Sequence, residues 1–196
     1  MKALFAMASY VLGSIPTGYL MVRAADRRDI RDVGSRSTGA TNVLRLKGWR
    51  FAVPVAVIDI LKGFLPAFLS LRLFKDPLFA SLCAFFAVAG HCFPFSIGFK
   101  GGKGVATSFG AYASLALRPL LPSVGIFFLA VLAFRTISLG SVLASISFPF
   151  FVLLFEGPRG VFLGSLAISL LVVFKHGGNI RRLLDGTERK FGEKIS

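Results

Sequence analysis

The chain has 196 residues, of which 55% are hydrophobic and 16% are charged, and its mean hydropathy is +0.74. A soluble domain carries about 25% charged residues, and a globule of this length cannot bury so much apolar surface. Disordered chains are poor in apolar residues, and Cys83 and Cys92 alone are too few for a disulfide scaffold. The composition therefore predicts an all-α polytopic membrane protein.

The net charge of +14 would favour a nucleic-acid partner in a soluble protein. Here the cations gather between apolar runs, and no basic stripe with interleaved exposed aromatic residues is present. We therefore expect no nucleic-acid partner. Loops that stay in the cytoplasm collect Lys and Arg, and this topological effect accounts for the charge.

Seven apolar stretches are predicted to span the membrane, since a spanning helix needs about 20 mostly apolar residues. The first stretch is interpreted as a retained span, because no small-residue cleavage site follows it. The fourth, fifth and seventh stretches are short, so six or even five spans are the alternative. The predicted spans are residues 4–22, 51–73, 78–97, 105–117, 120–134, 139–155 and 161–174.

The connecting loops predict the orientation. Seventeen Lys and Arg residues fall on one side of this arrangement and five on the other, with Lys62 inside a span. Because cations near span ends resist translocation, the N-terminus is predicted to lie outside and the C-terminus in the cytoplasm. No internal repeat or linker is evident, so residues 1–196 are predicted to form one domain.

Two donor-rich segments lie at predicted cytoplasmic ends. Residues 98–104 carry four glycines with Lys100 and Lys103 and lead directly into a predicted helix, which is typical of a phosphate seat. The alternative is a flexible basic loop beneath anionic headgroups. Residues 34–45 combine glycines, small hydroxyls, Asn42 and Arg45. Arg suits bidentate phosphate binding, and a locally capped turn is the alternative.

The remaining polar residues leave several interpretations open. His91 and His176 have no accompanying carboxylate or cysteine cluster, so no metal is expected. Each is either a satisfied residue at a span end or a group that handles a substrate or a proton. Asp59 and Lys62 stand three residues apart inside a span, where charges are costly. We interpret them as a structural or gating pair, with a direct role in the site as the alternative.

Taken together, these segments resemble the bacterial integral-membrane glycerol-3-phosphate acyltransferases that use acyl phosphate as donor. The resemblance covers essentially the whole chain and lies in three ordered motifs. One departure is Arg36-Ser37, where the family commonly has Gly-Asn. The matching residues are Gly34-Ser35 with residues 39–45, Gly90-His91 with residues 98–107, and His176 with Asn179-Ile180 and Arg182-Leu183; residues 59–63 and 138–141 also fit.

The resemblance implies transfer of a fatty acyl group from acyl phosphate to the sn-1 hydroxyl of glycerol 3-phosphate, giving lysophosphatidic acid and phosphate. This would be the first acylation of phospholipid synthesis, at the bacterial inner membrane, with the site open to the cytoplasm and no cofactor. The implied catalytic residues are Lys103, Ser141, His176 and Asn179. The implied substrate-binding residues are Ser35, Thr41, Asn42, Arg45, His91, Gly101, Gly102 and Gly104, the glycines through backbone N–H groups.

Some points stay open in the sequence. The resemblance suggests a substrate phosphate oxygen as the acceptor of the hydroxyl proton, and His176 is the alternative base. The expected partners are glycerol 3-phosphate, fatty acyl phosphate and membrane lipids. The sequence does not specify an oligomeric state, and a monomer would suffice. A transporter for a phosphorylated solute is the rival function, supported by the interrupted first span and by Asp59 and Lys62.

Overall fold

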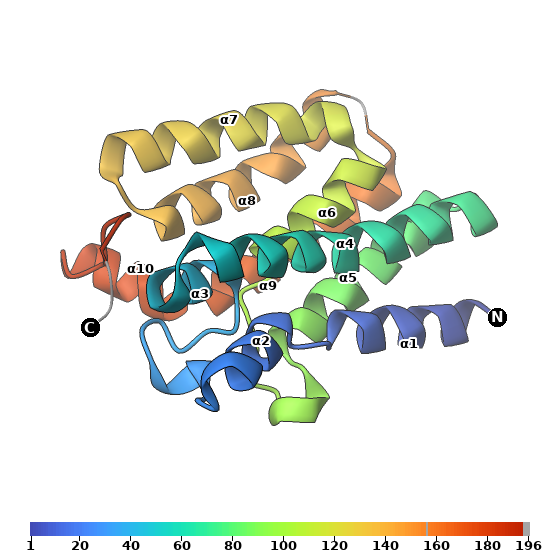
Figure 1. Cartoon of the computed structure of the whole chain (residues 1–196). Helices are drawn as coiled ribbons and strands as arrows, with labels where there is room; N and C mark the ends of the chain where they lie inside the picture. Colours follow the sequence, from blue (N-terminus) through green and yellow to red (C-terminus); the bar gives the residue numbers. More distant parts are fainter. Residues whose placement is uncertain (156, 194–196) are drawn as a thin grey trace.

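The computed structural model describes residues 1–155 and 157–193, and this part of the chain is helical throughout apart from its loops. Figure 1 shows an elongated bundle with the two chain ends at opposite ends. The helices are α1 (Lys2–Gly13), α2 (Thr17–Asp26), α3 (Ala40–Lys47), α4 (Trp49–Phe74), α5 (Pro77–Cys92), α6 (Val105–Leu115), α7 (Leu117–Phe134), α8 (Ile137–Leu154), α9 (Arg159–Lys175) and α10 (Gly177–Leu184), with 3-10 turns at Ile30–Asp32 and Phe95–Ile97.

The protein is a polytopic membrane protein with five or six candidate spans in the described residues. Five segments are long and apolar enough to cross a membrane, and the pair α9–α10, bent by 58°, makes a sixth if it is counted as one span. Each of the seven predicted stretches contains a helix, but α6 has only 11 residues. At about 1.5 Å per residue it is roughly half as long as the apolar layer is thick. Because α6 is too short to count as a candidate span, the described residues give at most six candidates where seven spans were predicted.

The first predicted span is interrupted where its sequence indicates. Gly13 ends α1, and α2 begins at Thr17 after Pro16. Proline lacks the N–H that a continuous helix would need, and the residue before it avoids helical geometry. The chain therefore turns at residues 14–16, and α2 carries the first basic segment away from α1 (Figure 1).

Glycines let α6 approach its neighbours closely. A Cβ on Gly63 would overlap the Thr107 carbonyl oxygen, and one on Gly110 would overlap that of Ile60. Small residues at such crossings allow backbone contact between membrane helices. As a result α6 packs tightly against α4, and it also contacts α5, α7 and α9. It lies between α4 and the antiparallel pair α7–α8 (Figure 1).

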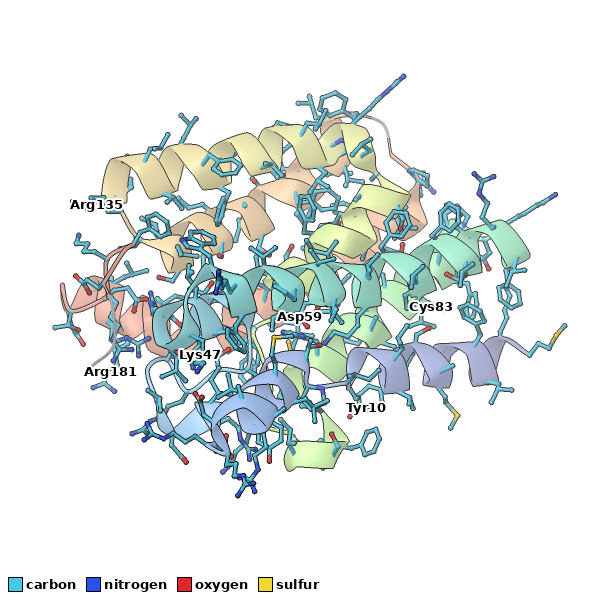
Figure 2. The ribbon with its side chains drawn as sticks, viewed as in Figure 1. Tyr10, Lys47, Asp59, Cys83, Arg135 and Arg181 are labelled. Carbon is cyan, nitrogen blue, oxygen red and sulfur yellow. The ribbon has the colours of Figure 1, made fainter. Side chains whose placement is uncertain are left out.

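The large apolar side chains on the outside fit a lipid environment. On α7, for example, Phe128, Leu129 and Leu132 are all more than half exposed, and the sticks in Figure 2 show such side chains projecting from the outer helices. An exposed apolar surface this extensive marks contact with lipid or another apolar partner. The inner faces of α5, α8 and α9 instead form a core that includes Val88, Phe148 and Val172.

Candidate active site

A cavity of about 630 Å³ opens where α3, α6, α8 and α10 begin. This volume is typical of sites for small molecules. One end of the cavity is polar, and the other extends between α6, α7 and α8, where the lining is mainly apolar. The polar end is lined by Ser35, Ser37, Thr41, Asn42, Arg45, Asp59, His91, Lys103, Ser138, Ser141, His176, Asn179 and Glu188.

Four helix N-termini face this cavity. Its lining includes the first residues of α3, α6, α8 and the segment that opens α10. In all four helices the N-cap residue makes no side-chain capping hydrogen bond. The first N–H groups of a helix lack partners within the helix and carry the positive end of its dipole. The cavity is therefore built to receive anions.

Two cationic side chains add to the positive electrostatic potential of the helix N-termini. None of the hydrogen bonds found among the described residues involves the Arg45 guanidinium, which lines the cavity. Lys103 donates from Nζ to Asn179 Oδ1 at 2.5 Å. Burial lowers the pKa of Lys103 to about 8, with Glu188 opposing the shift and Arg182, Arg45 and Lys175 adding to it. Both side chains can therefore pair with an anion in the cavity.

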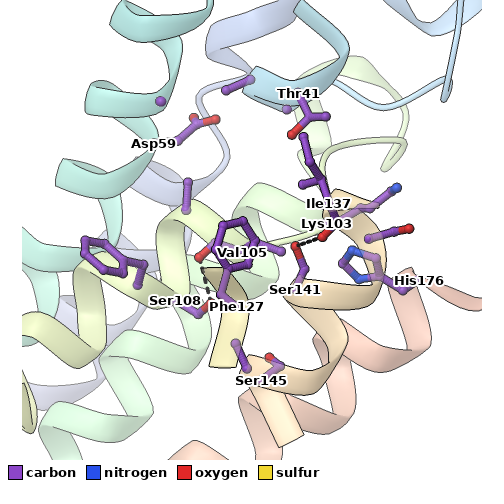
Figure 3. Close-up of a pocket in the computed structure, with 18 of the residues that line it drawn as sticks. Thr41, Asp59, Lys103, Val105, Ser108, Phe127, Ile137, Ser141, Ser145 and His176 are labelled. Carbon is purple, nitrogen blue, oxygen red and sulfur yellow. Dashed lines mark hydrogen bonds between the residues drawn. The ribbon is translucent and has the colours of Figure 1, made fainter. Parts of the chain in front are cut away.

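His176 presents one nitrogen as an acceptor. Its Nδ1 lies 2.7 Å from the Val172 carbonyl oxygen. A carbonyl can only accept, so Nδ1 carries the proton and Nε2 is left with a lone pair. Figure 3 shows His176 beside Lys103 and Ser141, and the Ser141 hydroxyl donates to the Ile137 carbonyl oxygen at 2.8 Å. This corner of the cavity thus combines a cation, a hydroxyl and an imidazole acceptor.

The comparisons with known proteins agree on one family. The family model for glycerol-3-phosphate acyltransferases matches residues 3–186. A glycerol-3-phosphate acyltransferase of Parasynechococcus marenigrum is 43% identical over 94% of this chain and 87% of that protein, and one of Syntrophotalea carbinolica is 40% identical over 94% and 95%. The chain belongs to the glycerol-3-phosphate acyltransferase family.

Two solved structures of the family have the same fold. Both are of PlsY (YgiH), an integral membrane glycerol 3-phosphate acyltransferase. Its glycerol 3-phosphate form superposes with a TM-score of 0.94 and 36% identity, covering 97% of this chain and 96% of that one. Its lysophosphatidic acid form gives a TM-score of 0.90 and 34% identity, with coverages of 98% and 96%.

The predicted site residues of this acyltransferase largely come together. Thr41, Arg45, Lys103, Ser141, His176 and Asn179 line one cavity, as do Ser35, Asn42, His91 and Gly104. Gly101 and Gly102 are buried behind it and are not part of its lining. Their N–H groups donate to the carbonyl oxygens of Cys92 and His91 at 3.2 and 3.0 Å. The prediction that these two amides offer donors to substrate is therefore wrong, and the free amides belong to the start of α6.

Asn42, predicted to bind substrate, is bonded to its own loop. Its Nδ2 lies within hydrogen-bonding distance of the carbonyl oxygens of Ile30, Val33 and Ser37, and its Oδ1 accepts from Ser35 N–H. With its amide donors engaged, Asn42 organises the loop before α3, and only its Oδ1 can accept a further hydrogen bond.

The same loop contains Arg36, where this sequence departs from the pattern of the family. Its φ of 56° lies in the left-handed region, where a residue with a Cβ costs roughly 1–2 kcal/mol. The glycine that the family commonly has at this position suits the turn better.

Glu188 is a residue of the site that the sequence did not reveal. Its Oε1 accepts from Ser138 Oγ at 2.9 Å and from Asn179 Nδ2 at 2.6 Å, and its Oε2 accepts from Arg182 Nε at 2.8 Å. Burial opposes the charged form, but these hydrogen bonds outweigh it and lower the pKa of Glu188. Glu188 is one acidic residue in a mixed-charge tail, and nothing in the sequence distinguishes it from Asp185 or Glu193.

The apolar end of the cavity is a slot between three helices. On α6, Val105, Ser108, Phe109 and Tyr112 line it at helical spacing. Tyr112 is about 10 Å along the helix from Val105, at about 1.5 Å per residue. The ring of Tyr112 stacks on Phe148 with centroids 3.7 Å apart. Both rings are buried, and they lie at the end of the slot opposite the cationic side chains.

Proposed function

We propose that this acyltransferase transfers a fatty acyl group from acyl phosphate to the sn-1 hydroxyl of glycerol 3-phosphate, producing lysophosphatidic acid and phosphate. The observation that carries the proposal is the two-part cavity. Four uncapped helix N-termini with Arg45 and Lys103 suit two phosphate groups at one end. The slot between α6, α7 and α8 suits a hydrocarbon chain at the other.

The reaction requires the two substrates to be held side by side. The hydroxyl oxygen of glycerol 3-phosphate attacks the acyl carbonyl carbon, the carbon–oxygen bond to phosphate breaks, and phosphate leaves with the electron pair. Negative charge grows on the carbonyl oxygen and on the leaving phosphate. Lys103 and the first amides of α6 are placed to stabilise this charge, which is commonly the largest contribution to catalysis. Arg45 and Thr41 hold the phosphate of glycerol 3-phosphate.

The hydroxyl proton passes to a phosphate oxygen of a substrate in this scheme. His176 Nε2, with its free lone pair, accepts a hydrogen bond from a glycerol hydroxyl and orients it. Asn179 holds the Lys103 ammonium in place through Oδ1. The alternative is that His176 itself takes the proton as general base.

Contacts among the loops support the proposed topology of seven crossings, with the N-terminus outside. Lys2 bonds Asp76 at 2.8 Å at one end of the bundle. At the other end Arg31 donates to the Ile97 carbonyl oxygen, and Phe191 N–H donates to that of Arg135. These contacts group the loops as the cation count predicts. The cavity then opens to the cytoplasm of a bacterial cell, at its inner membrane, where soluble glycerol 3-phosphate is made available.

A direct assay tests the function. Purified protein in detergent, given acyl phosphate and glycerol 3-phosphate, should release inorganic phosphate and form a monoacyl product. Arg45→Ala and Lys103→Ala should each lower kcat/KM at least about tenfold, since a charge-assisted phosphate contact is lost. Arg159→Ala, an exposed cation at the other end, is the matched control and should leave the rate unchanged.

The contrary outcomes are equally specific. Uptake of glycerol 3-phosphate into sealed vesicles without product formation would support a transporter instead. Equal rates for the Arg45, Lys103 and Arg159 variants would contradict the phosphate assignment. Near-native turnover of His176→Ala would exclude His176 as the base.

A further inference from the structure

A charged pair lies inside α4, and none of the proposed reaction steps uses it. Asp59 and Lys62 are 1% and 3% exposed, and Lys62 Nζ lies 2.7 Å from Asp59 Oδ1. Charges within a membrane span are expensive and need a partner. Replacing such a pair by apolar residues of similar size often leaves stability unchanged. Stability alone therefore gives little reason for a charged pair at this place.

Lys62 has two further neighbours. Its Nζ donates to the Ile15 carbonyl oxygen at 2.7 Å, in the break between α1 and α2, and lies 3.4 Å from His91 Nδ1. The distance from His91 Nδ1 to Asp59 Oδ1 is longer, at 3.6 Å. An ammonium group can only donate, so Lys62 bonds the Ile15 carbonyl oxygen and forms an ion pair with Asp59. His91 Nδ1 lies within reach of both the Lys62 ammonium and the Asp59 carboxylate.

His91 in turn contacts the glycine segment. Its Nε2 is the ring atom nearest to Gly102, and a Cβ on Gly102 would overlap it. The Gly102 N–H donates to the His91 carbonyl oxygen at 3.0 Å. The next residue is Lys103, and Gly104 then leads into α6. Both the side chain and the backbone of His91 thus contact Gly102, the residue that precedes Lys103.

We propose that Asp59 and Lys62 are positioning residues that act through His91 on the segment carrying Lys103. Asp59 orients the Lys62 ammonium, the two charged groups together fix the rotation of the His91 ring, and the His91 ring fixes Gly102. Lys103 and the first amides of α6 are thereby held at the cavity. His91 also lines this cavity, as does Asp59 (Figure 3). The inference rests on the proposed role of Lys103 in the reaction.

The test is a double-mutant cycle. Asp59→Asn combined with Lys62→Met removes both charges, so no lone buried charge is left, and its unfolding temperature should stay within about 5 °C of the native value. Its kcat should fall at least about tenfold with little change in KM, since misplacing a catalytic group by about 1 Å costs up to about 100-fold. In a Lys103→Ala background the same pair of changes should cost clearly less than in the native protein, because Lys103 is gone and only the first amides of α6 can still be misplaced.

The matched control is Lys2→Met combined with Asp76→Asn. This removes an ion pair of 2.8 Å at the other end of the bundle, and kcat should be unchanged. Amide hydrogen exchange gives a readout that needs no acyl donor. Exchange in peptides covering residues 101–106 should accelerate at least about tenfold in the Asp59/Lys62 variant and not in the control, as local opening becomes easier.

Each outcome decides the matter. Equal fold losses in the native and Lys103→Ala backgrounds, unchanged kcat in a folded variant, or unchanged exchange in residues 101–106 would each overturn the positioning role. An inactive native protein would instead contradict the acyl phosphate donor. In that case the exchange experiment still decides whether the charged pair holds the segment.

Discussion

Lys103 and Arg45 bring two different kinds of positive charge to the cavity. The guanidinium of Arg45 stays protonated at any physiological pH. The ammonium of Lys103 is buried among other cations, and this environment lowers its pKa to about 8. Near neutral pH both groups are charged, and above pH 8 only Arg45 remains so. The contribution of Lys103 should therefore be visible in the pH dependence of the reaction.

We expect kcat/KM to fall as the pH rises through about 8. The cationic form of Lys103 is the one that binds phosphate, and it is the major form only below its pKa. Above that pH the rate should fall by about a factor of ten per unit. Lys103→Arg should abolish the decline even where its absolute rate is lower, because arginine does not titrate in this range.

The measurement is the rate of product formation at subsaturating glycerol 3-phosphate, corrected for spontaneous hydrolysis of acyl phosphate. Arg159→Ala serves as the control and should reproduce the native profile. A native profile that stays flat to pH 9.5 (roughly 1.5 units above the pKa of Lys103) would show that Lys103 is not the titrating group.

At the residue scale, the sequence reveals side-chain chemistry but not how each group is used. Arg45, Lys103 and His176 each had a purely structural alternative, and the resemblance to the family selected them as site residues. Asn42 was selected for the same reason, yet its amide is used up by carbonyls of its own loop. Gly102 was expected to donate from a free amide that in fact bonds His91. Glu188 was overlooked because its importance comes from Ser138, 50 residues away.

At the element scale, the three helices of the slot have different inner faces. The wall from α8 is lined by small residues, Ser141, Ala144 and Ser145, before it reaches Phe148. Phe148 is about 15 Å along the helix from Ser138, at about 1.5 Å per residue. The stacked rings of Tyr112 and Phe148 close the slot at this depth. We therefore expect the two rings to limit the length of an acyl chain bound in the slot.

We expect substitutions on α8 to shift chain-length preference in opposite directions. Phe148→Leu deepens the slot and should raise the ratio of kcat/KM for a donor two carbons longer about tenfold. Ala144→Leu fills the slot and should shift the ratio towards shorter donors by a similar factor, since one methylene in an apolar pocket is worth about 1–3 kcal/mol.

The measurement compares saturated acyl phosphates of increasing length. Leu154→Ala is the matched control, because Leu154 lies on the same helix and is 62% exposed. It should leave the preference unchanged. Shifts in the same direction for Phe148→Leu and Ala144→Leu would mean that the chain lies elsewhere.

The elements themselves were largely predictable, and their lengths less so. Hydropathy located every long helix, and Gly13 and Pro16 marked the interruption of the first one. Hydropathy could not show that α6 ends at Leu115, short of the predicted end at residue 117. An apolar stretch reports only that a segment avoids water. Where the helix in that segment begins and ends depends on tertiary contacts such as that between Gly63 and Thr107.

At the scale of the whole molecule, the two chain ends lie at opposite ends of the bundle (Figure 1). This arrangement fits an odd number of crossings, with the short α6 as one of them. We propose that this helix of 11 residues serves in that role because Gly101, Gly102 and Gly104, just before it, are buried, and irregular backbone within a membrane is tolerated only under protein cover. The positive charge of the loops is the basis of our proposal that the cavity opens on the cytoplasmic side.

Cysteine labelling tests this orientation with little background, since both native cysteines, Cys83 and Cys92, are fully buried. Lys75→Cys should react with a membrane-impermeant maleimide in intact spheroplasts. Lys100→Cys and Lys190→Cys should react only in inverted membrane vesicles, because they share the side of the cavity and all three positions are exposed. The native chain is the control and should remain unlabelled. If Lys75→Cys and Lys100→Cys were labelled from the same side, an even number of crossings would separate them. The active site would then no longer be assigned to the compartment that holds glycerol 3-phosphate.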